Sequence, residues 1–236
     1  MDTRQPIYLL ASGHGLKSVL ATFANATKTI KGIGKSKPDV AFVGAASFKD
    51  SWLIYALIST FIRAGCDCRV HRVVLAPRDA DLEKARAILR DADAVFISGG
   101  DVDAGMQVLR DKDMVGFFQD LARNGKLLIG ASAGSIMMSK GWVRWRDPDD
   151  DSTAELFPCL GLVPFYCDTH AEEDDWVELK AALRLEAAGT TGYGIGSGAC
   201  LKAHPDGRLE ADGGSVARFA SLDGKIERQA DLLPPE

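Results

Sequence analysis

Residues 126–138, Lys-Leu-Leu-Ile-Gly-Ala-Ser-Ala-Gly-Ser-Ile-Met-Met, decide the fold of this chain. The apolar run that opens the stretch predicts a buried strand, and the run after Gly134 predicts a helix. Between them, residues 130–134 form the Gly-x-Ser-x-Gly pattern of a tight strand-to-helix turn. Such a turn exposes Ser132 beside backbone N–H groups that can stabilise an oxyanion. The sequence therefore predicts a nucleophile at Ser132.

Strand-like and helix-like segments alternate on the N-terminal side of this turn. Strands alternating with helices are typical of a mainly parallel sheet with helices on both faces. We therefore expect an α/β fold of this kind. The predicted strands are 7–10, 39–44, 68–75 and 94–97, and the predicted helices are 16–30, 51–64, 81–92, 102–109 and 114–122.

The last third of the chain has a different pattern. A charged loop is expected at residues 146–151, a strand at 162–167 and a helix at 174–186. Short strand-like runs punctuated by Gly and Asp then predict antiparallel hairpins at the edge of the same domain. No linker-like segment separates two units, so we expect one domain over residues 1–236. The runs in question are 199–202, 216–220 and 225–228.

Three small-residue segments follow predicted strands: residues 13–15 (Gly-His-Gly), residues 99–100 (Gly-Gly) and Ser132. Because the carboxyl ends of parallel strands share one edge of a sheet, these segments are expected to meet there. The Gly-His-Gly loop lacks the third glycine and the later acid of a dinucleotide site. We therefore interpret it as a wall of the site and predict no cofactor.

A serine nucleophile needs a base within hydrogen-bonding reach. The chain has four histidines. His170 ends a strand-like segment and is the leading candidate, followed by His14 in the glycine loop. His71 lies within a predicted strand, and His204 precedes a turn, so structural or surface roles are favoured for both.

Composition narrows the function further. The 236 residues carry a net charge of −5, which gives no electrostatic case for binding nucleic acid or an anionic membrane. No run is long enough for a signal segment or a membrane span. The odd number of cysteines, 5, without CxxC pairing, predicts reduced thiols in a cytoplasmic protein. The scattered histidines suggest no metal site.

Four motifs occur in a distinctive order: residues 98–101 (Ser-Gly-Gly-Asp), 130–135 (Gly-Ala-Ser-Ala-Gly-Ser), 161–170 (Gly-Leu, then a strand ending in His) and 192–196 (Gly-Tyr-Gly-Ile-Gly). With this order and spacing, residues 7–203 resemble the peptidase E and cyanophycinase family of serine peptidases. The resemblance implies a class I glutamine-amidotransferase-like fold, of flavodoxin-like topology, in which serine replaces the usual cysteine.

The same resemblance implies roles for individual residues. Ser132 would be the nucleophile and His170 the base, and the backbone N–H groups of Gly100 and Ala133 would form the oxyanion hole. Asp147 matches the position of the catalytic acid in peptidase E. Other members place an acid just after the Gly-Ile-Gly segment, where this chain has none.

Three alternatives for the acid therefore stay open. Asp147 orients His170, or a local acid, Asp168 or Glu172, does so, or the base works in a dyad. Asp147 also lies in an acidic run, and such runs are usually solvated loops.

The substrate site departs from the family pattern. The usual Gly-Gly-Asn is Gly-Gly-Asp here, so Asp101 is predicted to contact the substrate. His14, in the Gly-His-Gly loop, is predicted to contact it as well. Residues 171–176 read Ala-Glu-Glu-Asp-Asp-Trp, where family members commonly carry arginines that hold an aspartyl substrate. We hypothesise a substrate with a free amine or a basic side chain, because like charges repel. The alternative is that both acidic runs are solvated loops.

The sequence favours a serine hydrolase, of dipeptidase or cyanophycinase type, that cleaves a small peptide or isopeptide bond through an acyl-enzyme. A catalytically diverged small-molecule binder is the alternative from another class. An α/β-hydrolase-type esterase ranks last, because that fold normally needs a longer chain. The expected partner is a small peptide, and assembly stays open between a monomer and a homodimer.

Overall fold

The computed structural model, which describes residues 4–13, 15–47, 50–222 and 225–235, is built around a seven-stranded sheet. The strand order is β11-β10-β1-β5-β4-β2-β3. The five strands from β1 to β3 in this order are parallel, and β10 and β11 join as an antiparallel hairpin beside β1. The strands are β1 (Ile7–Leu10), β2 (Asp39–Val43), β3 (Arg69–Val73), β4 (Ala94–Ile97), β5 (Leu127–Ala131), β10 (Cys200–Ala203) and β11 (Leu209–Asp212).

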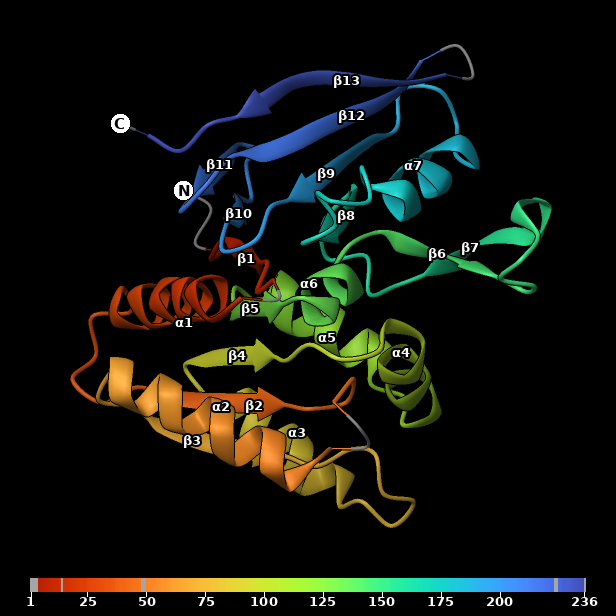
Figure 1. Cartoon of the computed structure of the whole chain (residues 1–236). Helices are drawn as coiled ribbons and strands as arrows, with labels where there is room; N and C mark the ends of the chain where they lie inside the picture. The colour runs from red at the N-terminus through yellow and green to blue at the C-terminus, as the bar shows by residue number, and fades with distance from the viewer. Residues whose placement is uncertain (1–3, 14, 48–49, 223–224, 236) are drawn as a thin grey trace.

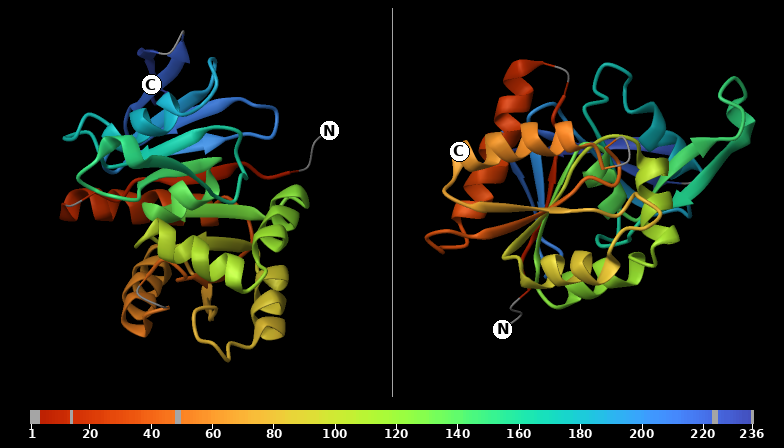
Figure 2. Two further views of the ribbon diagram at one scale, coloured as in Figure 1. Left: turned by 90° about the vertical axis from the view of Figure 1, so that its right-hand side faces the viewer. Right: turned by 90° about the horizontal axis from the view of Figure 1, so that it is seen from below.

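Helices cover both faces of this sheet (Figures 1 and 2). Ala26, Ile30 and Ile62 place α1 and α2 over one face, packed on Phe42 and Phe96. The opposite face is covered by α3, α4 and α5, whose buried side chains include Leu89, Met106 and Phe118. These helices are α1 (Leu16–Lys31), α2 (Trp52–Gly65), α3 (Leu82–Asp91), α4 (Val102–Asp111) and α5 (Val115–Arg123). The predicted α/β class, a mainly parallel sheet with helices on both faces, is confirmed.

A second sheet, of order β13-β12-β9-β8, lies above the first in Figure 1. The sequence patterns predicted only edge hairpins here, which holds for β10 and β11. Of the later strands, β12 instead pairs with β9 and β13 with β12, and β8 runs parallel to β9 on its other side. The elements are β8 (Tyr166–Thr169), β9 (Thr191–Ile195), β12 (Val216–Leu222), β13 (Lys225–Leu232) and α7 (Val177–Arg184), which packs on this sheet.

A long hairpin projects from the junction of the two sheets (Figure 1). Its strands β6 (Gly141–Trp145) and β7 (Ala154–Pro158) pair in an antiparallel ladder. The charged loop predicted at 146–151 forms its tip, next to the short 3-10 helix η1 (Asp151–Thr153). The helix α6 (Ala133–Met138) starts directly after β5 and packs between the sheets, with all six residues buried.

The two sheets share one apolar core. Leu9, Val95 and Leu128 of the first sheet belong to the same buried cluster as Tyr193 and Val216 of the second. All five cysteines are free and buried. Within the described residues, no helix has the length and apolar character that a membrane crossing requires.

Candidate active site

Ser132 stands at the sharp turn between β5 and α6. Its backbone has φ 54° and ψ −125°, a strained conformation for a residue with a side chain. The turn is held by a hydrogen bond from the amide of Ser132 to the carbonyl oxygen of Leu10 in the neighbouring strand β1, at 2.8 Å. The Gly-x-Ser-x-Gly segment therefore forms the strand-turn-helix geometry that the sequence predicted.

The glycines of this turn permit very close backbone packing. A Cβ atom on Gly134 would lie 2.2 Å from the carbonyl oxygen of Ile97 in β4. A Cβ atom on Gly130 would lie 2.6 Å from Met138 Cε and 2.7 Å from the carbonyl oxygen of Gly134. Real Cβ contacts are essentially never this short. Side chains at either position would thus push α6 away from the sheet and displace Ser132.

Ser135 fixes the start of α6 from the other side. Its hydroxyl accepts a hydrogen bond from the amide of Leu10 at 2.9 Å and donates one to the carbonyl oxygen of Leu10 at 3.0 Å. The side chain is fully buried. This pair of bonds fixes α6 to β1, so the turn that carries Ser132 is bonded to Leu10 through both Ser132 and Ser135.

His170 comes from the second sheet, immediately after β8. Its backbone has φ 47°, and its amide donates to the carbonyl oxygen of Ile195 at 2.9 Å. Its Nε2 lies 2.7 Å from Ser132 Oγ, a hydrogen bond between residues 38 positions apart. The structure thus brings together the serine and the histidine that the sequence selected, one from each sheet.

Gly100 follows β4 at the same edge. Its φ is 143°, and a Cβ atom there would lie 1.8 Å from the carbonyl oxygen of Ala46. That oxygen also accepts a hydrogen bond from the amide of Asp101 at 2.9 Å. Only glycine fits this position. At Gly99, a Cβ would lie 2.9 Å from Ser132 Cβ, so this backbone passes directly beside the serine.

Two backbone amides therefore belong to the surroundings of Ser132. Gly100 and Ala133 both line one cavity together with Ser132 and His170. Ala133 is the first residue of α6, where an amide has no acceptor within its own helix. Gly100 and Ala133 thus share a cavity with Ser132, as the predicted oxyanion donors must.

Glu172 is an acidic residue that interacts electrostatically with His170. Burial opposes its ionisation, but the hydrogen bond from Ser197 and the charge of His170 lower its pKa overall. Its Oε1 accepts from the amide of Ser197 at 2.9 Å. Ser197 directly follows the Gly-Ile-Gly segment, where the chain lacks a carboxylate of its own. Glu172 thus brings a carboxylate to that loop from a different element.

The structure does not bring Asp147 together with Ser132 and His170. Asp147 lies in the exposed tip of the β6–β7 hairpin, which extends away from α6 (Figure 1). Its carboxylate accepts from the amide of Asp149 at 3.1 Å, and its carbonyl oxygen accepts from Asp150. The acidic run serves the turn itself, because Asp side chains hydrogen-bond readily to amides two residues on.

The cavity beside Ser132 has a volume of about 370 Å³. Asp101, predicted to contact substrate, lines it and caps α4 by accepting from the amide of Ala104 at 2.8 Å. His14, the other predicted contact, lies outside the described residues. Its neighbour Gly13 abuts the Ser197 side chain, because a Cβ on Gly13 would lie 2.5 Å from Ser197 Oγ.

Two further residues line this cavity, Trp142 and Glu178, and no sequence pattern singled them out. The indole Nε1 of Trp142 donates to Glu178 Oε2 at 2.7 Å. Trp142 lies in β6, a strand that the patterns did not predict. Glu178 is in the first turn of α7, where an acid reads as an ordinary helix-start residue.

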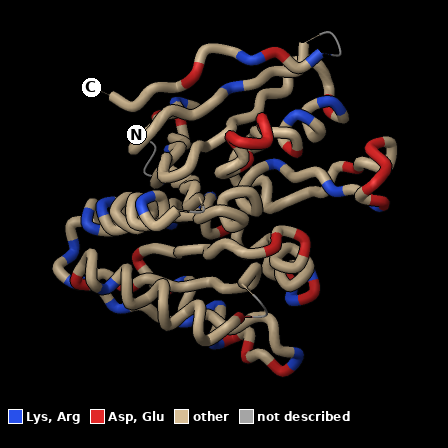
Figure 3. The backbone as a smooth tube through the Cα atoms, viewed as in Figure 1, with Lys and Arg blue, Asp and Glu red and all other residues tan. Residues whose placement is uncertain are grey.

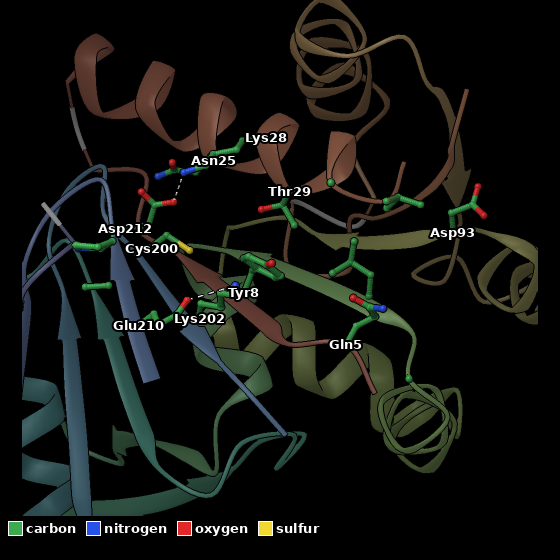
Figure 4. Close-up of a pocket in the computed structure, with 16 residues that line it drawn as sticks. Gln5, Tyr8, Asn25, Lys28, Thr29, Asp93, Cys200, Lys202, Glu210 and Asp212 are labelled. Atoms are coloured by element: carbon green, nitrogen blue, oxygen red, sulfur yellow. Dashed lines mark hydrogen bonds and ion pairs between the residues drawn. The ribbon is translucent and has the colours of Figure 1, made fainter. Parts of the chain in front are cut away.

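A larger cavity of about 690 Å³ lies at the opposite end of the parallel strands (Figure 4). It is bounded by the start of β5 and by the hairpin β10–β11. Its charged groups are paired, with Lys28 2.6 Å from Asp212 and Lys202 3.3 Å from Glu210. Sites in parallel sheets form at the carboxyl ends of strands, so the Ser132 edge is the better candidate.

The remaining histidines lie away from Ser132. His71 Nε2 contacts Asp39 Oδ1 at 2.7 Å on the surface of β2 and β3, and His204 lines another cavity with Arg4 and Gln5. In the part of the chain that the structure describes, no three His, Cys, Asp or Glu side chains are grouped as metal ligands.

The chain was compared with known proteins. The family model of peptidase family S51 matches residues 8–209. No curated protein matches the chain significantly.

Two solved structures share the fold. A peptidase from an acI-B1 Actinobacterium superposes with a TM-score of 0.71 at 20% identity, covering 99% of this chain and 96% of its own. A putative peptidase E protein from Listeria monocytogenes EGD-e gives a TM-score of 0.62 at 17% identity, covering 88% of this chain and 98% of its own. At these identities the likeness concerns the fold alone.

Proposed function

The chain belongs to peptidase family S51, and on that premise we propose that it is a serine peptidase with Ser132 as nucleophile and His170 as general base. The family supports a peptidase function. The observation that carries the serine mechanism is the 2.7 Å contact between Ser132 Oγ and His170 Nε2. Family membership and the strained turn at Ser132 point to the same residue.

The reaction is the hydrolysis of a small peptide or isopeptide bond. Ser132 Oγ attacks the carbonyl carbon while its proton passes to His170 Nε2. The amides of Gly100 and Ala133 hold the negative oxygen of the tetrahedral intermediate. The intermediate collapses to an acyl-enzyme as His170 gives its proton to the departing amine. Water then attacks the ester, His170 takes the water's proton, and the acid product leaves as Ser132 regains its hydrogen.

Glu172 is the third catalytic residue in this proposal, beside Ser132 and His170. A carboxylate beside His170 stabilises the imidazolium that forms when the base accepts a proton. The electrostatic interaction between Glu172 and His170 and the hydrogen bond from Ser197 support this assignment. Of the alternatives that the sequence left open for the acid, these contacts favour Glu172, since Asp147 has local turn partners.

The competing function, a diverged binder without catalysis, is favoured mainly by the missing carboxylate after Gly196. Glu172 supplies a carboxylate to that same loop through the amide of Ser197. This observation favours the enzyme over the binder.

Labelling with a fluorophosphonate probe tests the proposal. We expect the wild-type chain to be labelled and the Ser132→Ala variant to remain unlabelled. Peptide hydrolysis by Ser132→Ala should fall by at least about a thousandfold, because the covalent route is lost. Ser139→Ala, a serine at the other end of α6, is the matched control and should still be labelled. Labelling of the Ser132→Ala variant at the wild-type level would contradict the proposal.

A further inference from the structure

The cavity beside Ser132 is strongly acidic. Besides the serine and the histidine, it is lined by the carboxylates of Asp101, Asp168, Asp174 and Glu178. Among the described residues that line it, none is a lysine or an arginine. Figure 3 shows in red the acidic loop that precedes α7. An aspartyl side chain entering this cavity would meet charge of its own sign.

Two polar atoms of the cavity lining are buried without a hydrogen-bond partner in the described part of the chain. They are Asp168 Oδ2 and Thr169 Oγ1, on residues that are 5% and 3% exposed. The other carboxylate oxygen of Asp168 accepts from the amide of Thr169 at 2.7 Å. Buried acceptors without partners are costly, so they mark a place where a ligand with donors would be stabilised.

The charge on these carboxylates is also uncompensated. Burial and the nearby Glu178 raise the pKa of Asp168 to about 7, despite the amides of Thr169 and Leu179. Burial raises the pKa of Glu178 as well, with a contribution from Asp174. A bound cation would relieve this repulsion, because an opposite charge at short range favours the ionised carboxylates.

Two cations among the described residues, Arg144 and Lys140, are engaged by other carboxylates. Arg144 lies 2.7 Å from Glu155 and 3.3 Å from Asp103. Lys140 lies 2.8 Å from Glu186. Both side chains thus pair with carboxylates other than the four that line the cavity.

The cavity wall also suits an aliphatic stem. Ile136 and Val177 line it, and the indole of Trp142 is fixed against Glu178. A lysine or arginine side chain combines such a stem with a cationic head. The volume of about 370 Å³ is in the range of cavities that hold small ligands.

We propose that this cavity is the specificity pocket and that it binds a cationic nitrogen group of the substrate, with Asp168 and Glu178 as its anionic partners. The group is a basic side chain or the N-terminal ammonium of the peptide. The inference rests on the proposed function, because the pocket is defined by its position beside Ser132. A purely structural role for Asp168 beside the first turn of α7 is the competing explanation.

The test compares coumarin amides of lysine and norleucine, which differ by the side-chain ammonium, and of glutamate. For a side chain in the pocket, kcat/KM should favour lysine over norleucine by at least about tenfold. Asp168→Asn and Glu178→Gln should abolish that preference, lowering kcat/KM for the lysine amide at least about tenfold more than for the norleucine amide, since both substitutions keep shape and remove charge. The exposed Asp149→Asn, in the hairpin tip, is the charge-matched control and should retain the preference.

Acetylation of the α-amine distinguishes the two sources of positive charge. If the side chain binds, acetyl-lysine amide keeps its advantage over acetyl-norleucine amide. If the N-terminal ammonium binds, lysine and norleucine react alike, acetylation depresses both, and Asp168→Asn removes this sensitivity. Three outcomes would overturn the proposal. In the first, kcat/KM responds to neither positive charge, and in the second it is highest for the glutamate amide. In the third, both variants lower kcat/KM equally for all substrates, as a purely structural loss would.

Failure of the proposed function gives a different result. If fluorophosphonate labelling and all turnover are absent, binding of lysine amide and norleucine amide to the wild-type chain is measured by calorimetry. Tighter binding of lysine amide, lost in Asp168→Asn, would support the pocket without catalysis. Equal or undetectable binding of both amides would overturn it.

Discussion

Two acidic segments of similar composition have different surroundings in this molecule. Residues 147–151 form the exposed tip of the β6–β7 hairpin, and residues 172–175 lie between β8 and α7, beside His170 (Figure 3). The first segment makes hydrogen bonds mainly within its own turn. The second brings Glu172 to the Ser197 loop and Asp174 to the cavity. Acidic composition alone therefore does not indicate a site; the element to which the segment is attached does.

The strongest test of this difference exchanges one carboxylate in each segment for its amide. Glu172→Gln should lower kcat by about 10²–10⁴-fold, because an amide cannot stabilise the imidazolium of His170 as a carboxylate does. Asp147→Asn should leave kcat within about twofold, since its partners lie in the hairpin tip. Steady-state kinetics and probe labelling measure both. A large loss in Asp147→Asn with none in Glu172→Gln would reverse the assignment of the acid.

A second test uses the pH dependence of stability. The pKa of Asp168, raised to about 7, means that the folded chain keeps a proton that the unfolded chain releases near pH 4. Wild-type stability is therefore lost as pH rises from about 4 through about 7. Asp168→Asn removes this loss and should raise Tm at pH 8 by about 2–6 °C, with a smaller gain at pH 5.

A residue of the hairpin tip, Asp150, serves as a control because its effect on stability changes with pH in the opposite direction. Hydrogen bonds from Ser152 lower the pKa of the exposed Asp150, so its contribution is present above pH 4 and lost in acid. Asp150→Asn should lower Tm slightly at pH 8 and not raise it. Thermal unfolding monitored by circular dichroism measures both variants. The difference in Tm between Asp168→Asn and wild type is the quantity to compare. If this difference is lower at pH 8 than at pH 5, Asp168 mainly supports α7.

The smallest effect is expected from replacing the whole hairpin tip. Substituting Ser for Asp147, Asp149 and Asp151 together removes three charges from the exposed turn. We expect kcat/KM for the lysine substrate to change by less than about threefold, because exposed charges are screened beyond about 10 Å. A larger loss, measured at both low and high salt, would mean that the tip closes over the substrate.

Much of the fold was predictable because many of its elements have a recognisable local pattern of apolar residues. The strands β1, β2 and β4 are short apolar runs, and α3 has a clear apolar face, so their order implied a parallel sheet. The strands β6 and β7 were missed, since Gly141–Trp145 and Ala154–Pro158 are short and mix polar, aromatic and aliphatic residues. The second sheet was also missed, because pairing of β8 with β9 joins segments about 25 residues apart.

The sequence by itself predicted the turn that holds Ser132, because the glycines at 130 and 134 permit a close backbone approach that a Cβ atom would block. It also singled out His170 by its place after a strand. Only the tertiary structure decided which acid stands beside His170 and which carboxylates share a cavity with Ser132. These outcomes depend on how two sheets meet around α6, and that packing joins residues whose spacing in the sequence carries no periodic signal.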